Sequence, residues 1–178
     1  MELGTRHLRS VRSRGFTLME AALATVIVGV GVLSTVELFA GLTQQTRIAN
    51  HETTALFLAN NAHELLGELA FDDPLTGSAT FGPESNETLT GMESGSRPFN
   101  DLDDFAGSFN PPIDASRQSI EALSQYTQTI SVTNVDPNRP TLASAGSACR
   151  RVTVVITYRP SASEGVQEVY RVSWLRVR

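Results

Sequence analysis

The sequence predicts an α+β fold in which one long N-terminal helix carries a C-terminal antiparallel sheet. Three observations indicate this fold: an uncharged apolar run from Ala21 to Val36, a helical spacing of apolar residues beyond that run, and three β-rich segments near the C-terminus. The 178 residues suffice for one globular domain with an appendage. We expect five regions: a basic leader at 1–15, an apolar helix at 16–42, its amphipathic extension at 43–70, an irregular acidic connection at 71–125 and a sheet at 126–178.

The N-terminal region combines a basic flank with a stretch that is long enough to cross a membrane. Four arginines, Arg6, Arg9, Arg12 and Arg14, lie in the first fifteen residues, together with one acid, Glu2. With its apolar flanks the uncharged run reaches about 20–25 residues, which spans a bilayer at a rise of about 1.5 Å per residue. Because basic flanks tend to remain cytoplasmic, we expect the C-terminal body on the other side of the membrane.

Three interpretations of this region compete: a cleaved signal peptide, a plain signal anchor, and a processing signal at Gly15-Phe16, on the cytoplasmic side of the apolar run. A cleaved signal peptide needs a small-x-small site after a short apolar core. The stretches 29–31 and 32–34 match such a site poorly, and the acid Glu20 interrupts the start of the core. The residues therefore favour the processing signal.

The stretch Arg14-Gly15-Phe16-Thr17-Leu18-Met19-Glu20, followed by an apolar helix, resembles the class III signal of type IV pilins and type II secretion pseudopilins. The resemblance covers roughly the first third of the chain. It implies that a prepilin peptidase cleaves after Gly15 and methylates the new N-terminus at Phe16. It also implies an inner-membrane anchor and a periplasmic C-terminal domain. Glu20 matches the glutamate that the family carries near its mature N-terminus, whereas Glu37 stands where major pilins often have the proline of a mid-helix kink.

Glu20 is a charge at the edge of an apolar run, where an unpaired carboxylate costs several kcal/mol. Cleavage would create a positive amine at Phe16. In a bundle of parallel helices, Glu20 of one subunit can pair with the Phe16 amine of the next, so that assembly relieves the cost. The alternative is a glutamate that reaches the cytoplasmic headgroups by itself. Small residues at Ala21, Thr25 and Gly29 share one face and permit close helix packing, although such stripes are common.

Beyond Thr43 the sequence turns polar but keeps a helical period. The apolar positions at this period are Ile48, Ala55, Leu58, Ala62, Leu65 and Leu69. We expect one helix from about Phe16 to about Ala70, ended by the stretch 71–77, and its apolar stripe should pack on the C-terminal body. His51 and His63 lack metal-ligand spacing and are expected at the surface or at the helix interface.

The connection is rich in Gly, Ser, Pro, Asn and acids and shows no sustained period. Its aspartates Asp101, Asp103 and Asp104 could offer oxygen ligands to calcium, but the loop lacks the twelve-residue EF-hand pattern and its closing glutamate. We expect a solvated acidic turn without a metal. The anchors that should hold the connection to the body are Phe99, Phe105 and Phe109.

Short strings in this part of the chain carry a second resemblance. The Asp-Asp-Phe-x-Gly stretch at 103–107, together with 71–73 and 126–137, resembles minor pilins of the mannose-sensitive haemagglutinin type. These strings are degenerate, so they narrow the choice within the superfamily more than they support membership of it.

The C-terminal body contains three predicted strands, at 126–135, 151–158 and 166–177. Alternation places Val152, Val154 and Ile156 on one face of the second strand. It likewise places Tyr170 and Trp174 on one face of the third. Turn-rich stretches separate the strands, which favours an antiparallel sheet with one face packed on the helix.

The composition excludes several classes of function. A formal net charge of −5 argues against nucleic-acid binding, and the single cysteine, Cys149, permits no intrachain disulfide and is expected to be semi-buried. We find no catalytic motif and no cofactor motif, so we expect neither an enzyme nor a cofactor.

The sequence favours a structural subunit that resembles a minor type IV pilin. Its expected partners are a prepilin peptidase, other pilins or pseudopilins through the N-terminal helix, and inner-membrane lipid. The closest alternative is a minor pseudopilin of type II secretion, which shares the same N-terminus. A membrane-anchored periplasmic binding module that never polymerises is an alternative of another class.

Overall fold

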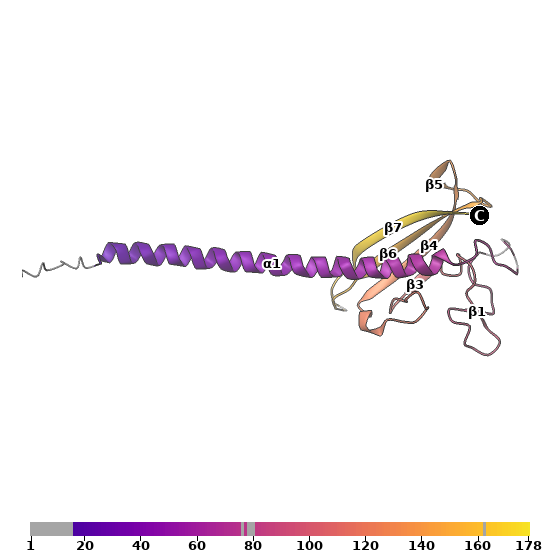
Figure 1. Cartoon of the computed structure of the whole chain (residues 1–178), viewed down its shortest axis with the longest axis horizontal. Helices are drawn as coiled ribbons and strands as arrows, with labels where there is room; N and C mark the ends of the chain where they lie inside the picture. Colours follow the sequence, from indigo (N-terminus) through magenta and orange to yellow (C-terminus); the bar gives the residue numbers. More distant parts are fainter. Residues whose placement is uncertain (1–15, 76, 78–80, 162) are drawn as a thin grey trace, which may run out of the picture. The chain divides into compact units, whose positions relative to one another are not determined.

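The computed structural model describes residues 16–75, 77, 81–161 and 163–178. The chain divides into two compact units, one that ends at Arg47 and one from Ile48 to Arg178, which we call the head. The helix α1, Leu18–Gly67, contributes to both units (Figure 1). The predicted helix of about 16–70 is therefore confirmed to within a few residues at each end.

In the first unit, α1 is a continuous apolar helix. Every described residue from Phe16 to Arg47 is exposed. The helix is long and apolar enough to cross a membrane, as its sequence predicted. An apolar surface of this extent is unstable in water, so it requires lipid or other apolar partners.

In the head, the second half of α1 buries the predicted apolar stripe. Ala55, Leu58, Ala62 and Leu65 are buried, and Leu69 is buried just beyond the end of the helix. Ile48, which we expected in this stripe, is instead 51% exposed. The spacing of three and four residues keeps these side chains on one helical face, and that face lies in the hydrophobic core.

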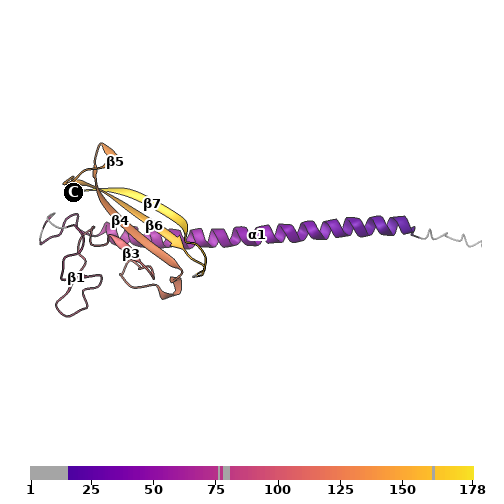
Figure 2. The same ribbon diagram turned by 180° about the vertical axis from the view of Figure 1, so that it is seen from behind.

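The head contains an antiparallel sheet in the order β3-β4-β6-β7, which Figures 1 and 2 show along the second half of α1. Its strands are β3 (Gly107–Phe109), β4 (Tyr126–Asp136), β6 (Cys149–Tyr158) and β7 (Gln167–Val177). The three long strands confirm the predicted ones. Two strands that join this sheet were not predicted: β3, and the short β5 (Arg139–Ala143), which pairs with the end of β4.

The face of the sheet that meets α1 carries the apolar side chains. Val152, Val154 and Ile156 are buried, as the alternation predicted. Tyr170 and Trp174 of β7 are partly buried against the same core. The two predicted histidine positions also meet this face, because the ring of His51 lies 4.1 Å from that of Tyr158, and the ring of His63 lies 4.7 Å from that of Trp174.

Two polar side chains of the sheet bind the helix backbone directly. Gln128, fully buried on β4, donates from Nε2 to the carbonyl of Leu58 at 3.1 Å, while its Oε1 accepts from the amide of Ile113 at 3.1 Å. Arg176 of β7 donates to the carbonyls of Leu66, Gly67 and Leu69 at 2.7–3.3 Å. The last carbonyls of a helix lack intrahelical partners, so Arg176 caps the end of α1.

The connection between α1 and β4 is mostly irregular, but it is firmly packed. It contains β1 (Glu87–Thr88) and β2 (Arg97–Pro98), which pair in parallel, and a short 3-10 helix at Glu121–Leu123. Leu102 and Phe105 are fully buried, and the rings of Phe99 and Phe105 meet edge to face at 5.2 Å. Phe109 also packs on the core, so all three predicted anchors are confirmed.

Candidate functional site

The predicted processing site lies at the start of α1. Gly15 lies outside the described residues. Phe16 precedes the helix, and its side chain is 75% exposed. The first helical hydrogen bond joins the amide of Ala21 to the carbonyl of Thr17 at 3.1 Å. Phe16 therefore stands immediately before a well-formed helix N-terminus, with its backbone outside the helical hydrogen-bond pattern.

Glu20 forms a capping box with Thr17. The carboxylate Oε2 of Glu20 accepts from the amide and from the hydroxyl of Thr17, each at 3.0 Å. The amide of Glu20 in turn approaches Thr17 Oγ1 at 3.2 Å. This reciprocal arrangement satisfies amides that the first helical turn leaves without partners. The pattern Thr-x-x-Glu before an apolar run is its known sequence signature, although we did not predict the cap.

The capping box uses only one of the two carboxylate oxygens of Glu20. Its bonds to Thr17 use Oε2, so within the described residues Oε1 has no hydrogen-bond donor. The carboxylate thus has a local role in starting the helix, and one oxygen is still available to a further donor. The predicted pair with a neighbour's N-terminal amine needs only that second oxygen.

Four threonine hydroxyls along the exposed part of α1 are satisfied within the helix. Thr25, Thr35, Thr43 and Thr46 each donate to the carbonyl four residues earlier, at 2.8–2.9 Å. A hydroxyl without a partner is costly in an apolar environment. These bonds make the four threonines compatible with lipid or with neighbouring helices.

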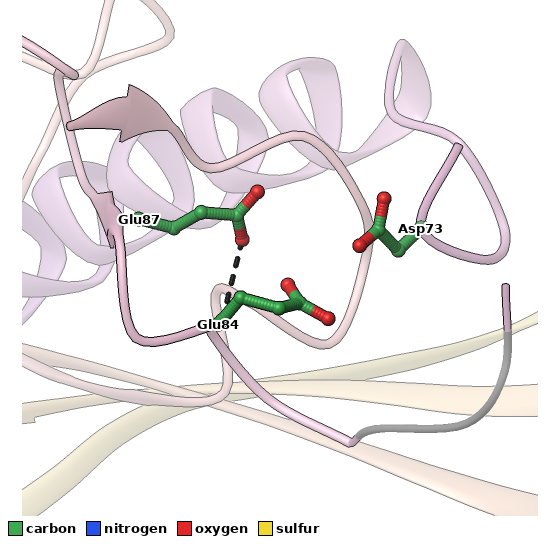
Figure 3. Close-up of side chains that lie close together, drawn as sticks. All are labelled: Asp73, Glu84 and Glu87. Carbon is green, nitrogen blue, oxygen red and sulfur yellow. Dashed lines mark hydrogen bonds between the residues drawn. The ribbon is translucent and has the colours of Figure 1, made fainter. Parts of the chain in front are cut away.

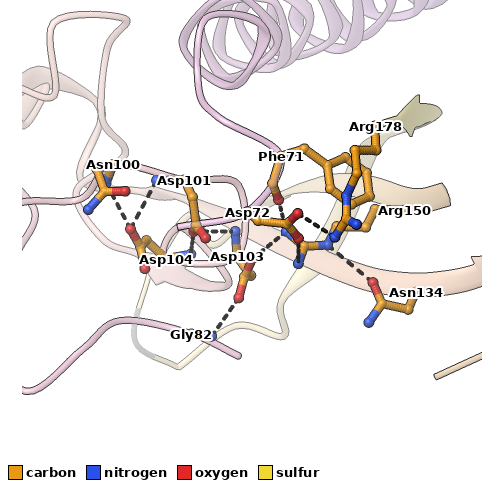
Figure 4. A network of polar contacts seen from close by, with 10 residues as sticks. All are labelled: Phe71, Asp72, Gly82, Asn100, Asp101, Asp103, Asp104, Asn134, Arg150 and Arg178. Atoms are coloured by element: carbon orange, nitrogen blue, oxygen red, sulfur yellow. Dashed lines mark hydrogen bonds and ion pairs between the residues drawn. The ribbon is translucent and has the colours of Figure 1, made fainter. Parts of the chain in front are cut away.

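Among the described residues of the head, Arg150 is a buried basic side chain at the start of β6 (Figure 4). Its guanidinium binds the carboxylate of Asp103 and reaches Asp72 Oδ1 at 3.3 Å and Asn134 Oδ1 at 3.1 Å. It also donates to the carbonyl of Phe71 and lies 4.5 Å above the ring of that residue. Arg150 thereby links the residues just after α1 and the later part of the connection to the sheet.

Arg178 completes this cluster from the end of β7. It pairs with Asp72 and lies 5.5 Å from the ring of Phe71, on which Arg150 also stacks (Figure 4). Asp72 is thus shared between two arginines. Such charge-assisted contacts hold the segment that follows α1 against the sheet.

The aspartates at 101–104 are buried, which corrects our prediction of a solvated acidic turn. Asp101 Oδ1 accepts from the amides of Asp103 and Asp104 at 3.1 and 3.2 Å. Asp104 Oδ2 accepts from the amides of Asn100 and Asp101 at 2.8 and 3.1 Å. Asp103 faces Arg150 instead and also accepts from the amide of Gly82. Backbone amides thus donate to all three carboxyl groups, and Arg150 also pairs with Asp103, which local composition alone did not show.

A different set of acids comes close together: one carboxylate oxygen from each of Asp73, Glu84 and Glu87 lies within 4.8 Å of the other two (Figure 3). Among the residues that the structure describes, Asp101, Asp103 and Asp104 form no such group. Oxygen atoms at this spacing can bind a hard cation such as Ca²⁺. Alternatively, two of the carboxyl groups can share a proton. Burial, a hydrogen bond with Glu84 and the charge of Asp104 raise the pKa of Glu87 to about 7, which favours the proton.

The sequence alone missed Arg150, Glu84 and Glu87 as members of these clusters. For Arg150 a signal was present, because the inward alternation of Val152, Val154 and Ile156 continues back to position 150. Glu84 and Glu87 lie in an irregular segment, where no period predicts which side chains turn inward. The one cysteine, Cys149, is buried beside Arg150, more deeply than we expected.

One long apolar helix followed by an antiparallel sheet, with the sheet packed on the second half of the helix, is a pilin-like architecture. It combines an exposed apolar helix with a capped N-terminus and a head that contains the buried Arg150–Asp103 pair. No protein-family model matches the chain, and no curated protein or solved structure matches it either.

Proposed function

We propose that this chain is a structural subunit that resembles a minor type IV pilin. A prepilin peptidase would process it between Gly15 and Phe16, leaving it anchored in the inner membrane with its head in the periplasm. The observation that carries the proposal is the exposed apolar half of α1, which directly follows the Gly15-Phe16 signal and is long and apolar enough to cross a membrane. Lipid covers such a surface before assembly, and the helices of other subunits cover it afterwards.

Lipid and a neighbouring helix are about equally apolar, so apolar area alone does not drive helices together in a membrane. Polar contacts and close packing must therefore favour assembly and set its register. Glu20 supplies one such contact, because its Oε1 lacks a donor among the described residues and a cleaved N-terminus is a strong one. The Phe16 amine of an adjacent subunit would be its partner.

Mass spectrometry of the protein isolated from membranes tests the processing step. We expect a mature N-terminus at an N-methylated Phe16. An intact Met1 in the membrane-embedded protein would contradict the proposal.

A matched pair of variants tests the assembly step. Glu20→Ala removes both the cap and the carboxylate, whereas Thr17→Ala removes the capping hydroxyl and keeps the carboxylate. We expect Glu20→Ala to lower incorporation into sheared filaments at least about tenfold, relative to its amount in the membrane, and Thr17→Ala to incorporate nearly as wild type. Equal losses in both variants would assign Glu20 to helix capping alone, and normal incorporation of both would contradict any assembly role.

A minor pseudopilin of type II secretion would use the same helix, cap and processing site. Genes adjacent to the coding sequence discriminate between the two: a retraction ATPase and pilus genes support the pilin, whereas a secretin and secretion genes support the pseudopilin. A membrane-anchored binding module that never polymerises would be absent from sheared filaments, even though it reaches the membrane in normal amounts.

A further inference from the structure

The exposed half of α1 contains two charges whose role the proposed function leaves open. Between Leu18 and Arg47 the helix has three charged side chains, Glu20, Glu37 and Arg47. Glu20 is engaged in the capping box. Glu37 and Arg47 are exposed, and within the described part of the chain neither has a hydrogen-bond or ion-pair partner.

Glu37 in particular stands in apolar surroundings. It lies between Val36 and Leu38, and the apolar run continues to Leu42. A carboxylate at such a position is unfavourable in lipid unless a cation compensates it. Arg47 is the one cation of this half of the helix, but it lies ten residues further along, about 15 Å at the helical rise. That separation is too long for an ion pair within one copy.

The two charges nevertheless share a broad face of the helix. At 3.6 residues per turn they lie about 80° apart around the axis, with Ala40 and Gln44 between them. A hollow of about 500 Å³ on this face is lined by Ala40, Thr43, Gln44 and Arg47. A Cβ atom at Gly41 would meet nothing within 4 Å, so no contact in the described chain accounts for a glycine inside the helix.

We propose that Glu37 of one copy pairs with Arg47 of a second, parallel copy that is displaced by about ten residues along the helix axis. The inference rests on the proposed function, because a single membrane topology makes all copies parallel. The hollow beside Arg47 leaves room for the side chains of the neighbouring helix, and the charges of the two copies are complementary. The partner is another copy of this chain, since its own sequence supplies both members of the pair.

The displacement has a consequence for assembly. Each copy offers Glu37 to one neighbour and Arg47 to the other, so the contact is heterologous and does not close on itself. Repeated contacts of this kind build an open helical array. The ion pair would thus favour one axial offset over the many that an apolar helix surface permits.

Site-directed cross-linking of full-length protein in membranes tests the pair. Two differently tagged copies in a Cys149→Ser background carry Glu37→Cys and Arg47→Cys, respectively, and are treated with a short bis-maleimide. A flexible linker is needed because a disulfide requires Cβ atoms within about 4.5 Å. We expect the mixed-tag product to exceed by about tenfold that obtained when Gln45→Cys, which lies about 160° away from Arg47 around the helix, replaces Arg47→Cys.

Charge reversal provides an independent readout in the otherwise native chain. Glu37→Arg and Arg47→Glu should each reduce the assembled fraction about tenfold through repulsion, and the double exchange should restore it to within about twofold. Binding of Arg47 to lipid phosphate predicts no rescue by the exchange. That result would overturn the proposal, as would equal cross-linking from position 45 or cross-linking of position 37 only to a different protein.

The outcomes separate this inference from the proposed function. Filaments that contain N-methylated Phe16, with reversal variants that assemble as wild type, would overturn the Glu37–Arg47 pair and leave the proposed function standing. Absence of any filament and of any cross-link between copies would overturn both.

Discussion

Arg150 Nη1 lies 2.5 Å from Asp103 Oδ1, and these two side chains, 47 positions apart in the chain, are only 3% and 1% exposed. The pair joins β6 to the connection that precedes the sheet. Removing one partner of a buried ion pair is far more damaging than the net contribution of the pair suggests, because the other charge is left in an apolar environment.

Arg150→Met should therefore lower the free energy of unfolding of the head by about 3–5 kcal/mol. Denaturation of the full chain in detergent, followed through the single tryptophan, Trp174, measures this loss. As a control, Arg139→Met breaks the exposed pair with Asp136 and should cost less than about 1 kcal/mol. Adding Asp103→Asn to Arg150→Met should recover part of the loss; if Arg150→Met is as mild as the control, the buried pair is not a major source of stability.

The acidic clusters predict a stability that falls as pH rises towards neutrality. Burial first, then the charges of Asp103 and Asp104, raise the pKa of Asp101 to about 7, and the pKa of Glu87 is also about 7. Both groups keep their protons in the folded head over a range in which the unfolded chain has released them. Their contribution is complete below about pH 4 and is lost as pH rises to about 7.

Glu87→Gln with Asp101→Asn should flatten this dependence, because each amide keeps an oxygen acceptor and does not ionise. Urea midpoints at several pH values between 4 and 8, for wild type and the double variant, isolate these two groups from the histidines and from the nearby Asp73 and Glu84. Parallel pH profiles for the two proteins would contradict the assignment.

The two hydrogen bonds of the buried Gln128 side chain predict that this residue stabilises the head. Gln128→Met keeps the volume but leaves the amide of Ile113 without its acceptor, which should cost about 1–3 kcal/mol. Ser131→Ala, on the same strand but exposed, should change stability by no more than about 0.5 kcal/mol. Equal unfolding midpoints for the two variants would show that the buried amide finds another partner.

Arg176 predicts local protection of the end of α1. Arg176→Ala leaves the carbonyls of Leu66, Gly67 and Leu69 without this donor and should speed hydrogen exchange in the last helical turn, by about 1–2 kcal/mol in opening free energy. Arg171→Ala removes an exposed arginine of the same strand that binds Glu168 instead, and should leave this exchange unchanged. Similar exchange in both variants would mean that Arg176 does not cap the helix.

Local periodicity was sufficient to predict the long helix and the three long strands. Ala55, Leu58, Ala62 and Leu65 recur at helical spacing, and apolar and polar residues alternate along the three long strands. The sequence of each of these elements therefore predicts which of its faces is buried. The short strands β3 and β5 show no such alternation, because three to five residues are too few to establish a period. Their pairing with β4 is decided by the longer strand.

The candidate sites also differ in whether the local sequence is sufficient to predict them. The Thr17–Glu20 cap is local and could have been predicted from its three-residue spacing. The burial of Asp101, Asp103 and Asp104 could not, since an aspartate-rich string looks solvated until its partners are known. Those partners are the surrounding backbone amides and, for Asp103, an arginine on a distant strand.

The sequence by itself determined the long helix, its apolar exposed half and its packed second half, because these depend on composition and on a repeat that neighbouring residues set. Only the tertiary structure decided which charges are buried and with whom, as for Arg150 with Asp103 and Gln128 with the carbonyl of Leu58. The physical reason is that a buried polar group is tolerated only when a specific partner meets it, and that partner can lie anywhere along the chain.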